Sequence, residues 1–253
     1  LNITPDSFYE ESRLVDFKDL EKKSEKIIRA DIIDIGAEST RPNSKPLTEK
    51  EELDRLNIVF NNMHLFNNKK LSIDTYKPNV ARKALINGFS MINDIYGGIN
   101  EDMLLLAAEF NVKIILMHIK GNPKTMQEDV YYKNIIDEII YYFDLRINKA
   151  MSLGVKKTNI IIDPGIGFGK SLSDNYKIIN NIREFKTMGF NVMVGLSRKS
   201  FLSIENDNPS ERLINTIAAN SVALLNGVDI IRVHDVEQHI ILREILNRFK
   251  LNK

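Results

Sequence analysis

The chain of 253 residues has no cysteine, which excludes disulfide bonds and thiolate metal sites. It has no basic excess either, because 35 lysine and arginine residues balance 34 aspartate and glutamate residues. A nucleic-acid-binding protein carries a strong basic patch, so we expect no nucleic-acid partner. No apolar run approaches the roughly 20 residues of a membrane span, so we expect no membrane insertion. The lack of cysteine is compatible with a reducing compartment, and we expect a cytoplasmic protein.

The amino terminus has neither an initiator methionine nor a secretory signal. Leu1, Asn2 and Ile3 have the pattern of the end of a strand rather than its beginning. We therefore expect the start of this first strand to lie upstream of Leu1.

Short β-branched runs alternate with amphipathic stretches along the chain. The strand-like runs cover residues 1–3, 31–35, 70–73, 91–93, 112–117, 159–162, 191–194 and 229–233. The helix-like stretches cover residues 17–29, 48–62, 77–87, 100–110, 133–153, 173–187, 209–226 and 236–249. Thr48 and Glu51 have the spacing of a capping box at the start of the second stretch. The alternation is typical of consecutive βα units.

Eight such units in about 250 residues predict an α/β protein, a single-domain (β/α)8 TIM barrel over residues 1–253. The run at 160–162 is apolar without alternation, as strands covered on both faces are. An open doubly wound sheet is the alternative. Such a sheet usually carries a glycine fingerprint at its first βα turn, and this sequence has none there. The long stretch at 133–153 is either a core-packing helix or part of a dimer face.

The most informative motif is DPGIGFGK at residues 163–170. A buried strand ends at Asp163, the proline stops it, and three glycines allow a tight turn. An acid at the carboxyl end of a parallel strand, beside a glycine-rich loop, is where α/β proteins place ligand chemistry. This motif therefore marks one wall of a candidate site.

Polar residues recur at the ends of the other strands, which meet at one end of a barrel. Asp74, Asn93 and Asp163 offer acceptors and an amide that suit the edge of a flat heterocycle. A second group, able to clamp an anion such as phosphate, comprises Arg41, Lys199, Arg232 and His234. Asn2 offers an oxygen suited to Mg²⁺. Together these groups favour a planar N-heterocycle attached to a phosphorylated leaving group.

Several of these residues also have a structural interpretation. Asp74 is also suited to be a helix cap or a turn former. We interpret Asp94 as structural, because strand alternation points it away from Asn93. A core or supporting role is the default for His118 and His234.

The sequence resembles the dihydropteroate synthase family over essentially its whole length. The resemblance rests on motifs that occur in order: NITPDSF at 2–8, ESTRP at 38–42, IND at 92–94, MH at 117–118 followed by GNP at 121–123, DPG at 163–165, SRKS at 197–200 and RVHD at 232–235. The family is a (β/α)8 barrel that joins 6-hydroxymethyl-7,8-dihydropterin diphosphate to 4-aminobenzoate. It makes 7,8-dihydropteroate for folate and releases pyrophosphate.

The resemblance implies a role for each matching residue. The pterin ligands would be Asp74, Asn93, Met117, Asp163 and Lys199, of which Asp74, Asp163 and Lys199 would be catalytic. The diphosphate ligands would be Thr40, Arg41, Arg232 and His234. The aminobenzoate would lie against Thr40, Pro42, Phe168 and Ser197. Asn2 would hold the Mg²⁺ cofactor, and relatives are commonly homodimers through their last helices.

Two other functions fit parts of this pattern. A methyltetrahydrofolate-binding methyltransferase domain shares the acid and amide positions but has no pyrophosphate to hold. A non-catalytic pterin-binding homologue would keep the pocket without turnover. The cationic clusters at 197–199 and 232–234 favour the synthase.

Overall fold

A computed structural model describes residues 1–3, 17–39, 45–121, 130–204 and 208–251 of the chain. Within these ranges, seven parallel strands form one sheet whose spatial order follows the sequence. The strands are β1 (Ile32–Ile35), β2 (Lys70–Asp74), β3 (Met91–Asp94), β4 (Lys113–Met117), β5 (Ile160–Asp163), β6 (Asn191–Val194) and β7 (Ile230–Ile231). The predicted strand positions are therefore confirmed from β1 to β7.

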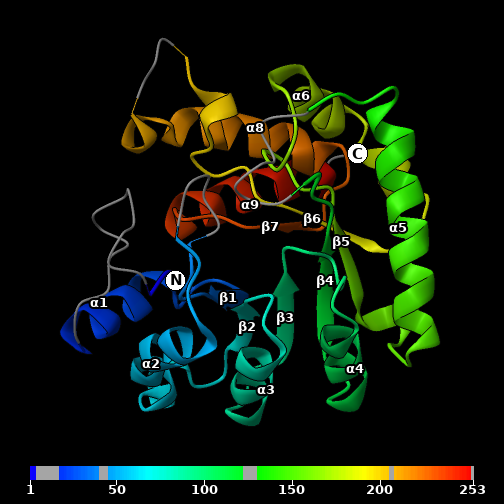
Figure 1. Ribbon diagram of the computed structural model, residues 1–253. Coiled ribbons are helices and arrows are strands. Elements are labelled where there is room, and N and C mark those ends of the chain that lie inside the picture. The colour runs from blue at the N-terminus through cyan, green and yellow to red at the C-terminus, as the bar shows by residue number, and fades with distance from the viewer. Residues whose placement is uncertain (4–16, 40–44, 122–129, 205–207, 252–253) are drawn as a thin grey trace.

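Helices connect consecutive strands and surround the outside of the curled sheet (Figure 1). They are α1 (Phe17–Ile27), α2 (Glu49–Phe60), α3 (Pro78–Ile86), α4 (Glu101–Glu109), α5 (Ile135–Ser152), α6 (Leu172–Asn180), α7 (Ile182–Lys186), α8 (Leu213–Leu225) and α9 (Val236–Leu251). Short 3₁₀ turns are η2 (Met63–Phe66), η3 (Lys157–Asn159), η4 (Ser200–Leu202) and η5 (Pro209–Glu211). Thr48 and Glu51 form the expected capping box on α2.

Two predicted helices are each broken into two pieces. The stretch at 173–187 divides into α6 and α7 at Asn181, whose φ of −109° and ψ of 24° interrupt the helical path. The stretch at 209–226 begins as the 3₁₀ turn η5 and continues as α8 after Arg212. Amphipathic spacing continues across both interruptions, so the pattern of apolar residues does not reveal them.

The first residues lie beside β1. Asn2 and Gly36 form an isolated parallel bridge, in which the Ile3 N–H donates to the Gly36 carbonyl at 2.8 Å. No ladder joins β7 back to residues 1–3 in the described ranges. Among the described residues the structure therefore shows a curled, parallel half-barrel of seven strands, and closure of the predicted eight-stranded ring stays a prediction.

The interior of the curled sheet is built in layers along the strands. A lower layer buries Met91, Ile115, Ile161 and Met193, and Ile32 and Ile230 pack against it. Side chains alternate along a strand, so the residue two positions further on points the same way. Those next residues are Asp34, Asn93, Met117, Asp163 and Arg232. An apolar layer thus forms the floor beneath a polar layer.

Helix α5 holds the loops that follow β3 and β4. The Tyr142 hydroxyl donates to the Met117 carbonyl at 3.1 Å, and Arg146 Nε donates to the Gly97 carbonyl at 2.9 Å. Phe143 on the same helix is fully buried, whereas Tyr141 is exposed. The core-packing interpretation of this helix is therefore the one that the structure supports.

Candidate active site

The polar layer faces a cavity of about 1310 Å³, which opens at the carboxyl ends of the strands and extends to Ala30 and Asp229, before β1 and β7. Among the residues that line this cavity are ten predicted site residues: Asn2, Asp74, Asn93, Met117, Asp163, Phe168, Ser197, Lys199, Arg232 and His234. The other three, Thr40, Arg41 and Pro42, lie outside the described residues. The fold thus brings together side chains from strands that are far apart in the sequence.

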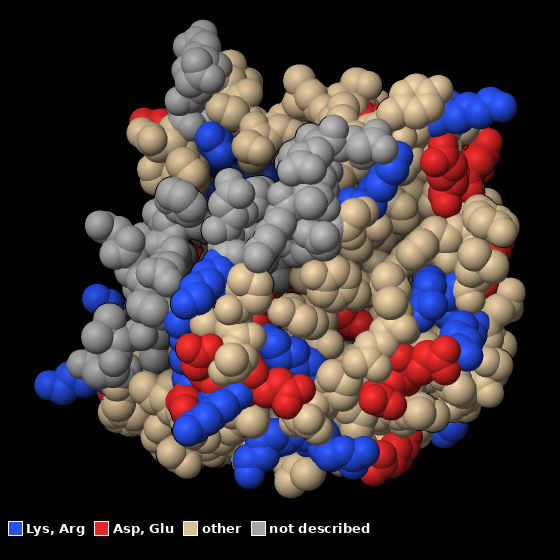
Figure 2. Space-filling view, viewed as in Figure 1, with Lys and Arg blue, Asp and Glu red and all other residues tan. Residues whose placement is uncertain are grey.

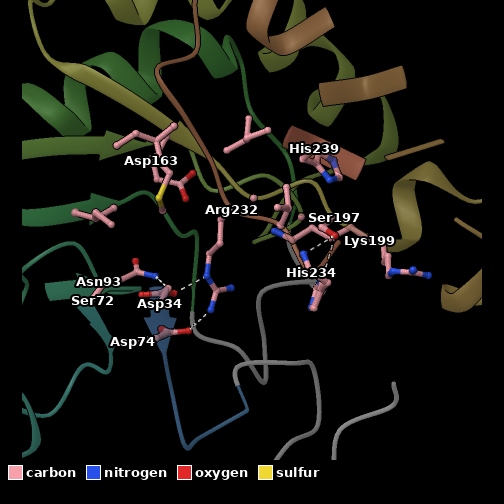
Figure 3. Close-up of a pocket in the computed structure, with 18 of the residues that line it drawn as sticks. Asp34, Ser72, Asp74, Asn93, Asp163, Ser197, Lys199, Arg232, His234 and His239 are labelled. Atoms are coloured by element: carbon pink, nitrogen blue, oxygen red, sulfur yellow. Dashed lines mark hydrogen bonds and ion pairs between the residues drawn. The ribbon is translucent and has the colours of Figure 1, made fainter. Parts of the chain in front are cut away.

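Arg232 crosses the cavity from the end of β7 to the opposite strands (Figure 3). Its Nε lies 2.6 Å from Asp34 Oδ2, and its Nη2 lies 2.6 Å from Asp74 Oδ2. Asn93 Nδ2 also donates to Asp34 Oδ2, at 3.0 Å. Asp34 Oδ1 is buried without a hydrogen-bond partner among the described atoms. This side of the cavity is therefore rich in acceptors, and one guanidinium neutralises it in part.

Burial changes the proton affinity of these acids. Desolvation raises the pKa of Asp74 to about 7, although the Arg232 cation opposes the shift. Desolvation also raises the pKa of Asp163, against the Gly165 N–H and the Lys199 charge. A carboxyl group whose pKa lies near neutral pH, as that of Asp74 does, is able to exchange a proton with a bound ligand, which is typical of functional sites.

The opposite side of the cavity carries cations on the loops after β6 and β7. The Lys199 ammonium donates to the Ile166 carbonyl and lies 4.6 Å from the centre of the Phe168 ring. Burial lowers the pKa of Lys199 to about 8, against the attraction of Asp163. Lys199 is therefore mostly charged at pH 7, and the Asp163 carboxylate attracts its ammonium group.

Ser197 fixes the imidazole of His234. The His234 backbone N–H donates to Ser197 Oγ at 3.3 Å, and that oxygen lies 2.9 Å from His234 Nδ1. The hydroxyl can accept the backbone proton and at the same time donate its own proton to Nδ1; we assign this arrangement, in which His234 is protonated on Nε2. Desolvation and the nearby Arg232 cation lower the pKa of His234 to about 4. At pH 7 the imidazole of His234 is thus uncharged.

The loop after β5 depends on its glycines. The Gly165 N–H donates to Asp163 Oδ1 at 2.8 Å and orients that carboxylate. Gly165 has a φ of +69°, and a Cβ there would lie 1.8 Å from the His118 carbonyl oxygen. A side chain at 165 is therefore excluded by both backbone conformation and space.

Three residues outside the predicted site belong to its surroundings. Asp34 lines the cavity, but the sequence pattern gave it no role because it lies inside a strand rather than at its end. Glu38 and Lys170 line the cavity too, although neither carried a predicted role.

By contrast, Asp94 accepts hydrogen bonds from the Tyr96 and Gly98 N–H groups at 2.9 and 2.8 Å, which confirms its structural interpretation.

The donor set limits how a metal is held. In the described ranges no three His, Asp or Glu side chains gather in a way that suits a metal ion. Asn2 lines the cavity together with Arg232 and His234. One amide oxygen beside an anion-binding wall fits Mg²⁺, which keeps several water ligands and binds phosphate.

Comparisons with known proteins agree with this site. A sequence profile for the family "Pterin binding enzyme" matches residues 1–234. The dihydropteroate synthase of Haemophilus influenzae is 38% identical over 239 residues, which cover 93% of this chain and 87% of that protein. The dihydropteroate synthase of Yersinia pestis, solved with a sulfonamide drug complex, superposes with a TM-score of 0.93 at 34% identity, covering 99% of this chain and 92% of that one.

A third similar protein is the dihydropteroate synthase of Xanthomonas albilineans, solved with 4-aminobenzoic acid. It superposes with a TM-score of 0.89 at 31% identity and covers 98% of this chain and 90% of that one. The profile and these relatives extend over the strands, the glycine loop and the cationic loops described above. The chain therefore belongs to the pterin-binding enzymes and, within them, to the dihydropteroate synthase family.

Proposed function

We propose that this chain is a transferase that joins 6-hydroxymethyl-7,8-dihydropterin diphosphate to 4-aminobenzoate in folate biosynthesis. The products are 7,8-dihydropteroate and pyrophosphate. One observation carries the proposal: a single cavity places an acid and amide wall from β1, β2, β3 and β5 opposite a cationic wall from the β6 and β7 loops. Such a cavity suits a heterocycle that carries an anionic leaving group.

The pterin would lie on the floor of the cavity. Asp74 and Asn93 occupy paired positions on neighbouring strands, as do Met117 and Asp163. Carboxylate and amide groups would accept and donate at the pyrimidine edge, while Met117 would pack against a ring face. Lys199 would donate to a ring acceptor from the opposite wall.

The diphosphate would lie against Arg232 and the Nε2–H of His234, together with Thr40 and Arg41. The Arg232 guanidinium would attract the diphosphate as a cation while its Nε and Nη2 groups stay paired with Asp34 and Asp74, and a neutral imidazole adds a directed hydrogen bond. Asn2 would hold Mg²⁺, which when bound would neutralise charge on the diphosphate. The aminobenzoate would lie nearer the cavity mouth, against Phe168 and Ser197, together with Thr40 and Pro42.

The reaction proceeds by dissociation of the diphosphate. The bond between the exocyclic carbon and the diphosphate oxygen breaks, and its electron pair leaves with the oxygen. Arg232 and His234 stabilise that developing charge, while Asp74 and Asp163 favour the cation that forms on the pterin. The amine of aminobenzoate then attacks the carbon and loses one proton. The chain's own residues need form no covalent intermediate.

The remaining expectations concern the whole molecule. The bridge between Asn2 and Gly36 supports residues 1–3 as the remaining strand of a closed, single-domain (β/α)8 barrel. Helices α8 and α9 pack on each other and expose Ile214, Leu225, Ile241 and Phe249, which supports a homodimer through these helices. Light scattering coupled to size exclusion would give the mass that tests the dimer.

The surface charge and the hydropathy of the helices are those expected of an enzyme that acts on small molecules. On the face seen in Figure 2, basic and acidic side chains are interspersed over the coloured surface. Among the described helices, none has the length and apolar character to cross a membrane. We propose a cytoplasmic enzyme without nucleic-acid or membrane partners.

The decisive assay supplies the dihydropterin diphosphate, labelled 4-aminobenzoate and Mg²⁺, and follows label into dihydropteroate. Product that depends on all three components is the expected result. Pterin binding without product would identify a non-catalytic homologue instead. Methyl transfer from methyltetrahydrofolate to a corrinoid, without dihydropteroate, would identify the methyltransferase alternative.

Asp163→Asn tests the proposed mechanism. It keeps the size of the side chain but removes the charge that faces the cation, so kcat should fall by about a hundredfold to a thousandfold. Asp94→Asn is the matched control, because Asp94 is also a buried strand-end acid but bonds only to its own turn. It should lower stability and leave kcat of the folded enzyme near that of the wild type. Equal turnover in Asp163→Asn and the wild type would refute the assigned role.

A further inference from the structure

Arg198 and Asp235 form a buried, bidentate ion pair between the two cationic loops. Arg198 Nε lies 2.9 Å from Asp235 Oδ2, and Nη2 lies 2.7 Å from Oδ1. Their side chains are only 8% and 12% exposed. Arg198 Nη1 also donates to the carbonyls of Pro209 and Ser210 at 2.8 and 2.7 Å. Four oxygen atoms from two other segments of the chain thus have fixed positions around the Arg198 guanidinium.

The backbone around Arg198 is held in an uncommon conformation. Its φ of +59° lies in the left-handed region, where a residue with a side chain costs about 1–2 kcal/mol. The Arg198 N–H donates to Thr216 Oγ1 at 3.0 Å, and Arg212 Nη1 lies 3.3 Å from the Arg198 carbonyl. These contacts offset the free-energy cost of the left-handed backbone. The side chains on either side of Arg198, those of Ser197 and Lys199, then contact different partners.

Those neighbours are residues of the cavity wall. Ser197, immediately before Arg198, contacts His234, and Lys199, immediately after it, contacts the loop after β5. Asp235 directly follows His234 in the chain. One ion pair therefore joins the residue between Ser197 and Lys199 to the residue beside His234.

The pair is also anchored in the helices behind the site. The Asp235 carbonyl lies 2.6 Å from His239 Nδ1, and His239 Nε2 lies 2.9 Å from Asn220 Nδ2. Both His239 and Asn220 are buried. Through these contacts, α8 and α9 fix the position of Asp235 and hence of the pair.

We propose that Arg198 and Asp235 are positioning residues of the active site: their ion pair holds Ser197 against His234 and keeps Lys199 over the loop after β5. This role rests on the proposed function, because it gives Ser197, Lys199 and His234 their catalytic purpose. Neither residue of the pair needs to touch substrate. Loss of the pair should let the two loops separate while the strands below them stay in place.

Nitrogen NMR of histidine-labelled protein tests the geometry without any substrate. The chain has four histidines, so the ring signals are few enough to assign by substitution. In the wild type, His234 should show a single tautomer with the proton on Nε2. In Arg198→Met and Asp235→Asn, we expect exchange between tautomers at His234, since Ser197 is no longer held. An unchanged His234 spectrum in both variants would overturn the proposal.

Kinetics give a second, separate measurement. A misplacement of about 1 Å can reduce a rate about a hundredfold, so Arg198→Met should lower kcat by about tenfold to a hundredfold. Arg198→Lys keeps the charge but loses the bidentate geometry, so it should recover only part of the rate. The matched control is Arg82→Met, which removes an equally bidentate but exposed arginine that pairs with Glu109.

The two proposals fail in distinguishable ways. A wild-type chain without turnover would refute the proposed function, and the NMR test would still decide the role of the pair. If Arg198→Met does not fold, the near-isosteric Asp235→Asn carries the same test. Arg198→Met with wild-type kcat and wild-type KM for both substrates would show that the pair serves stability alone.

Discussion

Lys77 and Lys170 are both buried near the cavity, but their ammonium groups have opposite surroundings. Lys77, at the start of α3, pairs with Glu38 and with Glu52, whose Oε2 lies 2.6 Å from its Nζ. Lys170, in the loop after β5, donates to the Phe168 carbonyl at 2.9 Å and lies 3.0 Å from His118 Nδ1. No carboxylate among the described residues lies within ion-pair distance of Lys170.

Their pKa values shift in opposite directions. Burial alone would lower the pKa of Lys77, but the Glu38 and Glu52 carboxylates raise it. Burial lowers the pKa of Lys170 to about 7, because the attraction of Asp163 compensates only in part. Carboxylate partners, rather than depth of burial, therefore decide whether a buried lysine stays charged.

Each lysine also restrains a loop of the site. Lys77 holds Glu38, which accepts a hydrogen bond from Tyr76 at 2.9 Å and lines the cavity after β1. Lys170 holds the carbonyl of Phe168, a proposed aminobenzoate contact. One restraint is an ion pair and the other is a set of hydrogen bonds to uncharged groups, so they should respond differently to substitution.

The largest expected effect is that of Lys77→Met. It leaves Glu38 and Glu52 without their cation, and removal of one partner of a buried ion pair costs about 3–5 kcal/mol. Urea unfolding would measure this loss in the free energy of unfolding. Lys50→Met is the control, because Lys50 is exposed on α2 and should change that free energy by about 0.5 kcal/mol at most. A loss no greater than the control would mean that the cluster contributes little.

A double substitution sharpens this interpretation. Glu52→Gln in the Lys77→Met background removes a buried charge that has lost its partner, so it should recover about 1–2 kcal/mol. In the wild-type background the same substitution should destabilise, because Lys77 then loses one of its two carboxylates. Additive effects of the two substitutions, in the same unfolding assay, would contradict a coupled pair.

The sequence supports much of this fold because apolar periodicity and turn residues are local signals. Strands β1 to β7 and the capping box of α2 were predictable for that reason. The break at Asn181 was not, since the apolar spacing runs through it. Closure of the barrel depends on pairing between distant segments, which no local pattern specifies.

The candidate site was predictable where chemistry coincides with a strand end, as at Asp74 and Asp163. Asp34 received no predicted role because it lies within a strand, although it is two residues beyond Ile32 on the same face. The residue two positions after each residue of the buried apolar layer points into the cavity, and this rule identifies Asp34 from Ile32. The roles of Lys77 and Lys170 depend on which groups surround each ammonium, and only the folded structure shows those groups.

The last expected effect is a slope of stability with pH rather than a fixed loss. In Lys170 the pKa is lower in the folded chain, about 7, than the usual value of 10.5. Between these values the unfolded chain binds more protons, so wild-type stability rises with pH by at most about 1.4 kcal/mol per unit.

Lys170→Met removes this titration, although it also leaves the Phe168 carbonyl and His118 Nδ1 without a donor. Its stability relative to the wild type should therefore fall steadily from pH 7 to pH 10, whatever its offset at pH 7. Urea unfolding across this range measures the difference, and parallel curves would show that a carboxylate compensates Lys170 as it does Lys77.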